Sequence, residues 1–239
     1  MKPRYAVYFA PEQGSPWWEF GSRWLGRDEC QDVNKVQHAL AEIGPVELRE
    51  ITAQPRRYGF HATLKAPFSL SGSHSAADLT ARLRALAATR KPVLLGPMQA
   101  LVLGDFVALV PALVPALVPA LVSDELMALA AACVTTLDDL RRPLSAADLA
   151  RRRVEQLDAR EQELLQQYGY PYVLERFRFH LTLSGPLARP TAQRVLQAVA
   201  APVAQLNATA PLVLDRLCLF VEPAPGQPFQ RMADVALSA

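Results

Sequence analysis

Two short segments of the chain carry the same polar residues in the same frame. The sequence reads FHATLKAPF at 60–68 and FHLTLSGPL at 179–187, so both copies follow F-H-x-T-L-x-x-P. The chain has only four histidines, and His61 and His180 occupy equivalent positions in the two copies. Histidine titrates near neutral pH, with a reference pKa of about 6.5, so a pair can serve as general base and general acid. The repeat therefore predicts proton-transfer chemistry.

Each copy is expected to be a β-strand, over residues 59–65 and 178–183, because polar and apolar residues alternate along it. Alternate residues of a strand share a face. The shared polar faces would carry His61, Thr63 and Lys65 in the first copy and Arg178, His180, Thr182 and Ser184 in the second.

An ordinary amphipathic strand would explain one copy, but packing alone would repeat the apolar positions rather than the polar ones. The repeat therefore favours a functional role for the histidines, and to a smaller extent for the threonines. For Lys65, Arg178 and Ser184, which follow from strand alternation only, a structural role explains the residues equally well.

The elements that must position these residues repeat as well. Each copy is followed by a proline and a predicted helix, at 76–88 in one half and 191–206 in the other. Residues 12–27 are expected to form a loop that packs aromatic side chains. The other expected elements are strands at 4–10, 92–95, 98–103, 106–110, 212–221 and 230–237, and helices at 32–43, 124–140 and 145–168.

This order predicts an α+β fold, with antiparallel sheets and helices packed outside. We expect a single domain over 1–239 with two lobes in a pseudo-twofold arrangement, each lobe carrying one H-x-T strand. A catalytic cleft between the lobes would then hold two imidazoles, two hydroxyls and several cations. Hydroxyls and cations suit the nonbridging oxygens of a phosphoryl group. The sequence has no G-x-S-x-G, no P-loop and no H-E-x-x-H motif.

Composition narrows the class of partner. The 239 residues are 51% hydrophobic and 20% charged with a net charge of +2, which indicates a globular protein without a basic stripe for nucleic acid. Three cysteines without C-x-x-C argue against disulfides and structural zinc, and favour a reducing, cytoplasmic location. The A-L-V-P repeats at 107–122 contain three prolines, so we expect an extended insert there and no membrane span.

Paired H-x-[ST]-x motifs, one per lobe, are the signature of the 2H phosphoesterase superfamily, which the segments HATL at 61–64 and HLTL at 180–183 match. The chain also resembles a bacterial family in that superfamily, usually described as a putative phosphonate metabolism protein. The stretches that carry this resemblance are RYAVYFAP, WLGRD, RRYGFHATLKAPF, LRRPLSAADLARRR and YGYPYVLERFRFHLTLSG. The A-L-V-P insert departs from it.

The resemblance implies a LigT-like bilobal fold and metal-independent chemistry, without a cofactor, on a phosphodiester that is commonly cyclic. His61 and His180 would be the catalytic pair, with Thr63 and Thr182 holding phosphate oxygens. One histidine would remove a proton from water and the other would protonate the leaving alkoxide; the sequence leaves their order open. Candidates for substrate contact are Lys65, Arg57, Arg178, Tyr172 and Ser184.

Two other classes of function stay open. The first is a non-catalytic protein of the same fold that binds a nucleotide or an RNA end. The second is a metal enzyme with His61 and His180 as ligands, although no third ligand stands at a usual spacing. The expected substrate is a small phosphodiester, such as a ribosyl 1,2-cyclic phosphate or a nucleoside 2′,3′-cyclic phosphate; an RNA end is less favoured. We expect no stable protein partner.

Overall fold

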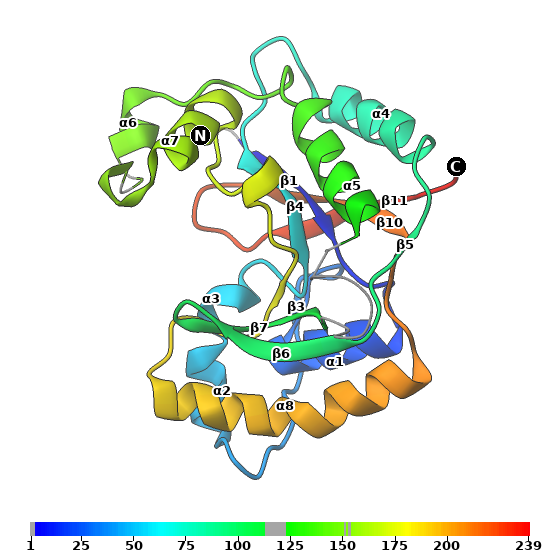
Figure 1. The fold of residues 1–239 in the computed structure, drawn as a ribbon, viewed down its shortest axis with the longest axis vertical. Helices are drawn as coiled ribbons and strands as arrows, with labels where there is room; N and C mark the ends of the chain where they lie inside the picture. The colour runs from blue at the N-terminus through cyan, green and yellow to red at the C-terminus, as the bar shows by residue number, and fades with distance from the viewer. Residues whose placement is uncertain (1–2, 113–122, 151, 153) are drawn as a thin grey trace.

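The computed structural model of the chain describes residues 3–112, 123–150, 152 and 154–239 (Figure 1). Helices and antiparallel strands are mixed along it, which confirms the α+β class. The expectation for the A-L-V-P repeats is only partly testable. Strand β7 (Phe106–Pro111) covers their beginning, and residues 113–122 lie outside the described residues.

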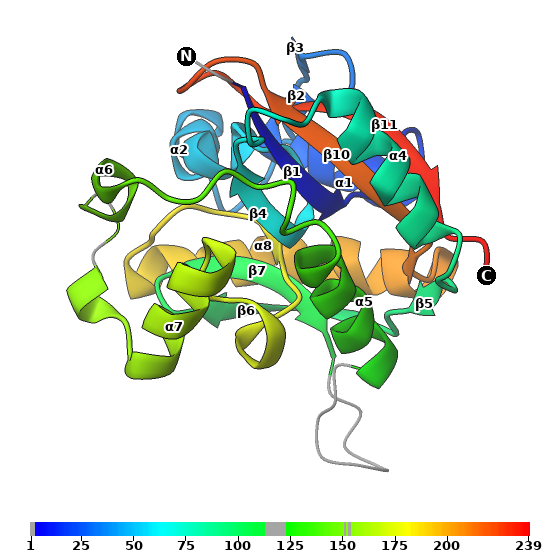
Figure 2. The same cartoon turned by 90° about the horizontal axis from the view of Figure 1, so that it is seen from above.

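A four-stranded antiparallel sheet has the order β11-β10-β1-β4. Its strands are β1 (Arg4–Phe9), β4 (Ala62–Phe68), β10 (Arg216–Glu222) and β11 (Gln230–Ala236). Helix α4 (Ala76–Ala87) packs against β10 and β11, and α5 (Asp124–Thr135) packs against β4 (Figure 2). Val7 and Phe9 point into this main core, whereas Tyr8 points to the opposite face and packs with Phe220.

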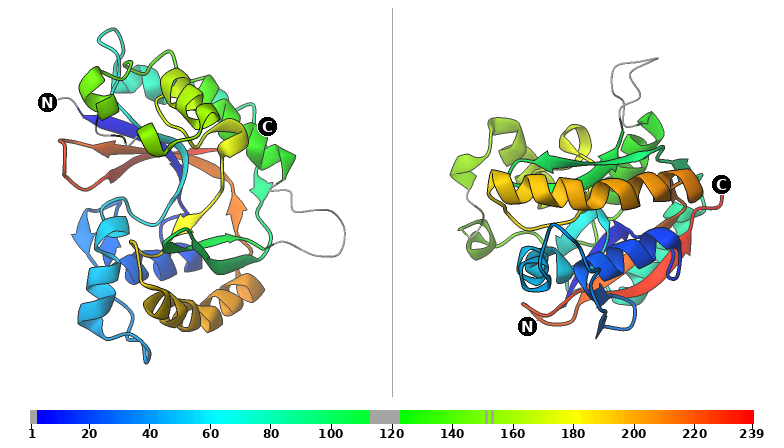
Figure 3. Two further views of the ribbon diagram at one scale, coloured as in Figure 1. Left: turned by 60° about the vertical axis from the view of Figure 1, so that its left-hand side comes forward. Right: turned by 90° about the horizontal axis from the view of Figure 1, so that it is seen from below.

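A three-stranded antiparallel sheet has the order β6-β7-β8, with β6 at Met98–Leu103 and β8 at Leu181–Thr182. The long helix α8 (Arg189–Thr209) packs across β6 and β7 (Figure 3). Thr63 of the first H-x-T segment thus lies on the edge strand β4 of one sheet, and Thr182 of the second lies on the edge strand β8 of the other. The strands predicted over 59–65 and 178–183 are displaced or shortened, because each histidine directly precedes its strand. An edge strand has a free side, so both segments can border a pocket.

The remaining elements are short. Two small antiparallel ladders join β2 to β3 and β5 to β9. The bounds are β2 (Arg27–Asp28), β3 (Val33–Asn34), β5 (Val93–Leu94), β9 (Val213–Leu214), α1 (Pro16–Leu25), α2 (Pro45–Ile51), α3 (Ala53–Arg56), α6 (Ala146–Ala150), α7 (Ala159–Tyr168) and the 3₁₀ turns η1 (Val154–Gln156) and η2 (Leu174–Arg176). Among the described residues, no helix combines the length and apolarity that crossing a bilayer requires.

The loop predicted over 12–27 is wrong, because α1 occupies most of it. The hydroxyl of Ser15 accepts a hydrogen bond from the Trp18 amide, and Pro16 follows at the first helical position. Helix α1 ends at Gly26, whose φ of 76° is left-handed. Its tryptophans are buried on one face, so the aromatic residues taken for a loop are the packing face of a helix.

Other elements also differ from the prediction. The strand predicted over 212–221 is interrupted at Asp215, between β9 and β10. Residues 32–43 form no helix but contain strand β3 followed by irregular chain. The helix predicted over 145–168 is broken, because Asp158 starts α7 anew with a capping box to Glu161. The predicted helix over 124–140 ends at Thr135.

Candidate functional site

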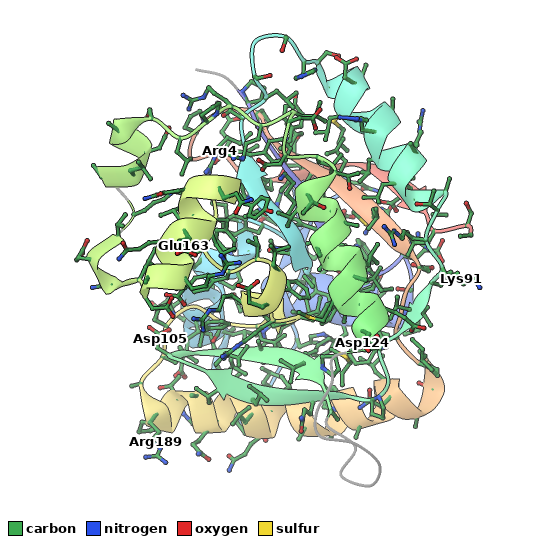
Figure 4. All side chains as sticks on the ribbon, turned by 45° about the horizontal axis from the view of Figure 1, so that its top comes forward. Arg4, Lys91, Asp105, Asp124, Glu163 and Arg189 are labelled. Carbon is green, nitrogen blue, oxygen red and sulfur yellow. The ribbon has the colours of Figure 1, made fainter. Side chains whose placement is uncertain are left out.

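A pocket of about 460 Å³, here called the central pocket, borders both H-x-T segments. His61 and Thr63 line it from the first copy, and Thr182 and Ser184 from the second. The other polar or aromatic side chains of its lining are Arg4, Tyr8, Gln54, Tyr58, Asp105, Phe106, Arg152 and Tyr170; Arg4 and Asp105 are labelled in Figure 4. Segments far apart in the sequence therefore supply hydroxyls, an imidazole and guanidinium groups to one pocket.

The imidazole of His61 has a fixed orientation. Its Nδ1 lies 2.9 Å from the carbonyl oxygen of Gly59, and because a carbonyl only accepts, Nδ1 carries the hydrogen. Gly59 has a φ of 80°, and a Cβ there would approach the side chain of Glu29 to 2.8 Å, so glycine suits this turn. The lone pair of neutral His61 is then on Nε2, 3.3 Å from Thr63 Oγ1.

Aromatic rings surround His61 and lower its proton affinity. The ring of Tyr8 stacks on the imidazole with 3.8 Å between centroids. The ring centroids of Tyr58 and Phe220 lie 6.0 and 6.2 Å from that of His61. Burial lowers the pKa of His61 to about 4, the hydrogen bond to Gly59 acts in the opposite direction, and the charge of His180 lowers it further. The last effect places the two imidazoles within electrostatic reach of each other.

His180 repeats the local geometry of His61 in a different setting. Its Nδ1 donates to the carbonyl of Arg178, two residues earlier, over 2.8 Å, which again leaves Nε2 with the lone pair. Phe106 lies nearest among the aromatic rings, with 5.7 Å between centroids. Burial lowers the pKa of His180 below its usual value, and the hydrogen bond to Arg178 partly offsets this.

His180 lines a second pocket of about 510 Å³, here called the His180 pocket. It adjoins the central pocket, because Thr63, Phe106 and Tyr170 line both. The side chains of Tyr172 and Arg178, both exposed, also line the His180 pocket. The two histidines therefore stand on neighbouring parts of one depression.

Both histidines are neutral at pH 7 in this structure, because both pKa values lie below the usual range. Acid–base chemistry by the pair requires one charged and one neutral imidazole. A bound phosphate anion would stabilise an imidazolium and raise its pKa. The charged partner therefore has to arise with the substrate or at acidic pH.

Strand alternation fails at Lys65, which does not line the central pocket. Strand β4 bulges after Thr63: Tyr8 pairs with Thr63, and the preceding residue Val7 pairs with Lys65, so Leu64 is passed over. The Lys65 ammonium is buried and donates to the carbonyl of Val134 over 3.0 Å. Because that carbonyl belongs to the last turn of α5, Lys65 stabilises the end of a helix.

Two other candidates for substrate contact have partners in the protein. Ser184 lines the central pocket, but its hydroxyl accepts from the Val107 amide and donates to the Gly185 carbonyl, both over 2.9 Å. Arg57 is outside the lining and forms an ion pair with the buried carboxylate of Glu222. The polar groups of both residues are therefore already engaged by partners within the protein.

Sequence reasoning missed several lining residues. Arg4 and Tyr8 share a face of β1, and only the pairing of Tyr8 with Thr63 brings that face beside the histidine. Alternation within RYAVYF could have placed both residues on one face of a strand. It could not have shown which strand would lie next to that face. Arg152 and Tyr170 come from the region between α5 and β8 and reach the pocket through tertiary folding alone.

Metal ligands do not gather in the described part of the chain. No group of three histidine, cysteine, aspartate or glutamate side chains is placed there as a metal ion would require. Among the three cysteines, Cys133 and Cys218 are buried, and burial raises the pKa of the Cys133 thiol to about 12.

The sequence matches a family model described as "Protein of unknown function (DUF1045)" over residues 63–230. It is 40% identical over 229 residues to a ribose 1,5-bisphosphate phosphokinase PhnN of Janthinobacterium sp. (strain Marseille), covering 95% of this chain and 49% of the relative. A protein of the same name from Laribacter hongkongensis (strain HLHK9) is 35% identical over 228 residues, covering 95% and 50%. The chain thus spans about half the length of these curated relatives.

Proposed function

The chain belongs to the DUF1045 family of proteins, and from that premise we propose that it is a metal-independent phosphoesterase that hydrolyses a phosphodiester, preferably a cyclic one. The observation that carries the proposal is the paired geometry of His61 and His180. In both residues a backbone carbonyl two positions earlier holds Nδ1, and Nε2 is left to exchange protons with a ligand. In this proposal the two sheets are the two lobes, and the adjoining pockets are the cleft between them.

The proposed reaction needs one base and one acid. His61 Nε2 takes a proton from water, the water oxygen attacks phosphorus, and the bond from phosphorus to the leaving oxygen breaks. Protonated His180 gives its Nε2 proton to that oxygen, so a phosphomonoester and an alcohol result. We assign the base to His61, since aromatic burial together with the charge of His180 keeps it neutral.

The hydroxyls and cations of the pocket would hold the phosphoryl group. Thr63 and Thr182 line the central pocket, and the hydroxyl of Thr63 already lies beside His61. Donation from these hydroxyls to nonbridging oxygens would place phosphorus close to Nε2 of the base. Arg4 and Arg152 supply positive charge to the same pocket.

The relatives are named as kinases, which is not the activity proposed for this chain. Their name describes proteins twice as long as this chain, and no G-x-x-x-x-G-K-[ST] loop occurs in this sequence. We therefore place the kinase activity in the other half of the relatives. Because a ribose phosphate stands in their name, a ribosyl cyclic phosphate, in phosphonate metabolism, is our first candidate substrate.

A panel of cyclic phosphodiesters tests the proposal. Purified protein is incubated with ribose 1,2-cyclic phosphate and nucleoside 2′,3′-cyclic phosphates, with and without EDTA, and monoester product is measured. We expect turnover that EDTA does not reduce and that His61→Ala and His180→Ala each abolish, whereas Arg189→Gln, an exposed residue outside the lining of both pockets, keeps it. Binding without turnover would favour the nucleotide-binding alternative, and loss of activity in EDTA would favour a metal enzyme.

A further inference from the structure

A third hollow, here called the basic pocket, adjoins the central pocket. It measures about 70 Å³, and its lining contains five basic side chains and one acidic one: Arg4, Lys65, Arg141, Arg142, Arg152 and Asp148. Arg4, Ala66, Pro67 and Arg152 line the basic and the central pockets, but none of them lines the His180 pocket. The cations therefore lie on a different side of the central pocket from His180.

The carboxylates around the basic pocket are shared among several cations. Buried Glu222 pairs with both Arg4 and Arg57. Asp138 pairs with both Lys65 and Arg141.

Arg142 pairs with Asp148, the acidic side chain in the lining of the basic pocket. Six basic side chains, including Arg152, thus surround three carboxylates, and the pocket carries excess positive charge. An excess of positive charge on a pocket wall favours an anionic ligand.

Two guanidinium groups converge where the basic and central pockets meet. Burial has the largest effect and lowers the pKa of Arg152, the negative charge of Asp148 acts in the opposite direction, and the positive charges of Arg4 and Arg141 lower the pKa by smaller amounts. Like charges held close together repel each other, and an anion between them would relieve that repulsion. Arg152 is anchored by a 2.7 Å hydrogen bond to the Gly169 carbonyl, and the ion pair with Glu222 orients Arg4.

The positions of both groups are therefore set before a ligand arrives. Tyr170, which lines all three pockets, adds a phenol whose pKa burial raises to about 12, so it stays a neutral hydrogen-bond donor. A phosphate monoester accepts several such hydrogen bonds and is compact enough to reach them together.

We propose that Arg4 and Arg152 bind a second phosphate group of the substrate, so that the enzyme selects cyclic phosphodiesters that carry an additional phosphate monoester. This inference rests on the proposed phosphoesterase function, because it takes the scissile phosphorus to lie between His61 and His180. The monoester then lies on the Arg4 and Arg152 side of the central pocket. The Nε2 atoms of the histidines are left for the diester.

Matched substrate pairs test this selection. Adenosine 2′,3′-cyclic phosphate and ribose 1,2-cyclic phosphate are each assayed with and without a 5-phosphate. We expect wild-type kcat/KM to be at least about tenfold higher for the phosphorylated member, since a hydrogen bond to a charged group contributes that much. In Arg152→Gln this ratio falls toward one, mainly through KM, and in the control Arg189→Gln it is kept.

Arg4→Gln should also reduce the ratio. Because this change leaves the buried Glu222 with fewer partners, the Tm of the variant is measured as a control for folding. Equal kcat/KM for both members in the wild type, or an unchanged ratio in Arg152→Gln, would overturn the inference.

A binding measurement separates this inference from the proposed function. If neither member of a pair is hydrolysed, the phosphoesterase proposal fails for that substrate, and calorimetry with the same compounds still tests the phosphate site. Tighter binding of the 5-phosphorylated member by about tenfold, lost in Arg152→Gln, supports the site. Equal binding of both members overturns it.

Discussion

The two H-x-T segments share their local geometry and differ in what surrounds them. In both, a carbonyl two residues earlier fixes Nδ1 and leaves Nε2 with the lone pair. His61 lies against the ring of Tyr8, on the face of the four-stranded sheet that carries Phe220, and its Nε2 faces Thr63. His180 directly precedes a two-residue edge strand, and its ring centroid lies 5.7 Å from that of Phe106.

A repeated motif can therefore fix the orientation of an imidazole without fixing its proton affinity. The hydrogen bond to Nδ1 is local and is the same in both copies. Desolvation and neighbouring charge depend on distant segments, and for His61 they act together. An acid and a base can thus arise from one motif used twice.

The largest expected effect comes from removing either histidine. His61→Gln and His180→Gln should each lower kcat by about 10²- to 10⁴-fold, the usual contribution of one positioned proton transfer. Turnover of the best substrate of the panel is measured, with Tm as the control for folding. A loss confined to one copy would show that the motif is used only once for chemistry.

The pH dependence of kcat/KM distinguishes which histidine is the base and which is the acid. If His61 is the base and His180 the acid, wild-type kcat/KM peaks between about pH 4 and pH 6.5, because the base must be neutral and the acid charged. His61→Gln should remove the acidic limb from the residual activity, and His180→Gln the alkaline limb. If each variant removed the opposite limb, the assignment would be reversed.

A third prediction concerns the stability contributed by Lys65, the position at which the second copy has Ser184. Lys65→Met should lower the free energy of unfolding by about 2–3 kcal/mol, because the last turn of α5 and Asp138 lose a buried donor. Urea unfolding measures the change, with the exposed Lys91→Met as the matched control (Lys91 is labelled in Figure 4). Equal stability of the two variants would contradict the helix-stabilising role.

Stability should also depend on pH through His61. Because the folded pKa is about 4 and the unfolded value about 6.5, the unfolded chain binds more protons between these pH values. The contribution is fully present above about pH 6.5, and up to about 3 kcal/mol of stability is lost as the pH falls to 4. Denaturant unfolding at several pH values measures this slope, which should be shallower in His61→Gln; an identical slope would refute it.

The smallest expected effect separates the aromatic surroundings of the two copies. Tyr8→Leu removes the stacked ring and should raise the pKa of His61 by about one unit, with little change at His180. Phe106→Leu should act on His180 alone, and by less, since its ring is farther away. NMR titration of the two imidazoles measures both pKa values, and equal responses of the two histidines would contradict the different roles of their aromatic neighbours.

Much of the pattern within single elements was predictable. Phe60, Ala62 and Leu64, and Phe179, Leu181 and Leu183, are buried as alternation predicted. Strand β1, helix α4 and strand β11 lie close to their expected ranges. Local rules suffice there, because neighbouring residues decide which side of a strand or helix is apolar.

The errors arose where tertiary contacts outweigh the local pattern. The bulge in β4 depends on its pairing with β1, and it turns Lys65 away from the histidine face. Helix α1 was missed because its buried tryptophans were taken for loop residues, although Ser15 and Pro16 marked its start. The lobes and their relation by a twofold axis stay a proposal.

The amino-acid sequence alone was enough to identify the repeated residues of the candidate site: two histidines in one frame, each followed two residues later by a threonine. Alternation along a strand is a local property, and it is enough to put these side chains on one face. Which residues lie opposite that face depends on how the chain folds. Arg4, Arg152 and Tyr170 reach the pocket through the packing of segments distant in sequence, and burial by Tyr8 and its neighbours sets the proton affinity of His61.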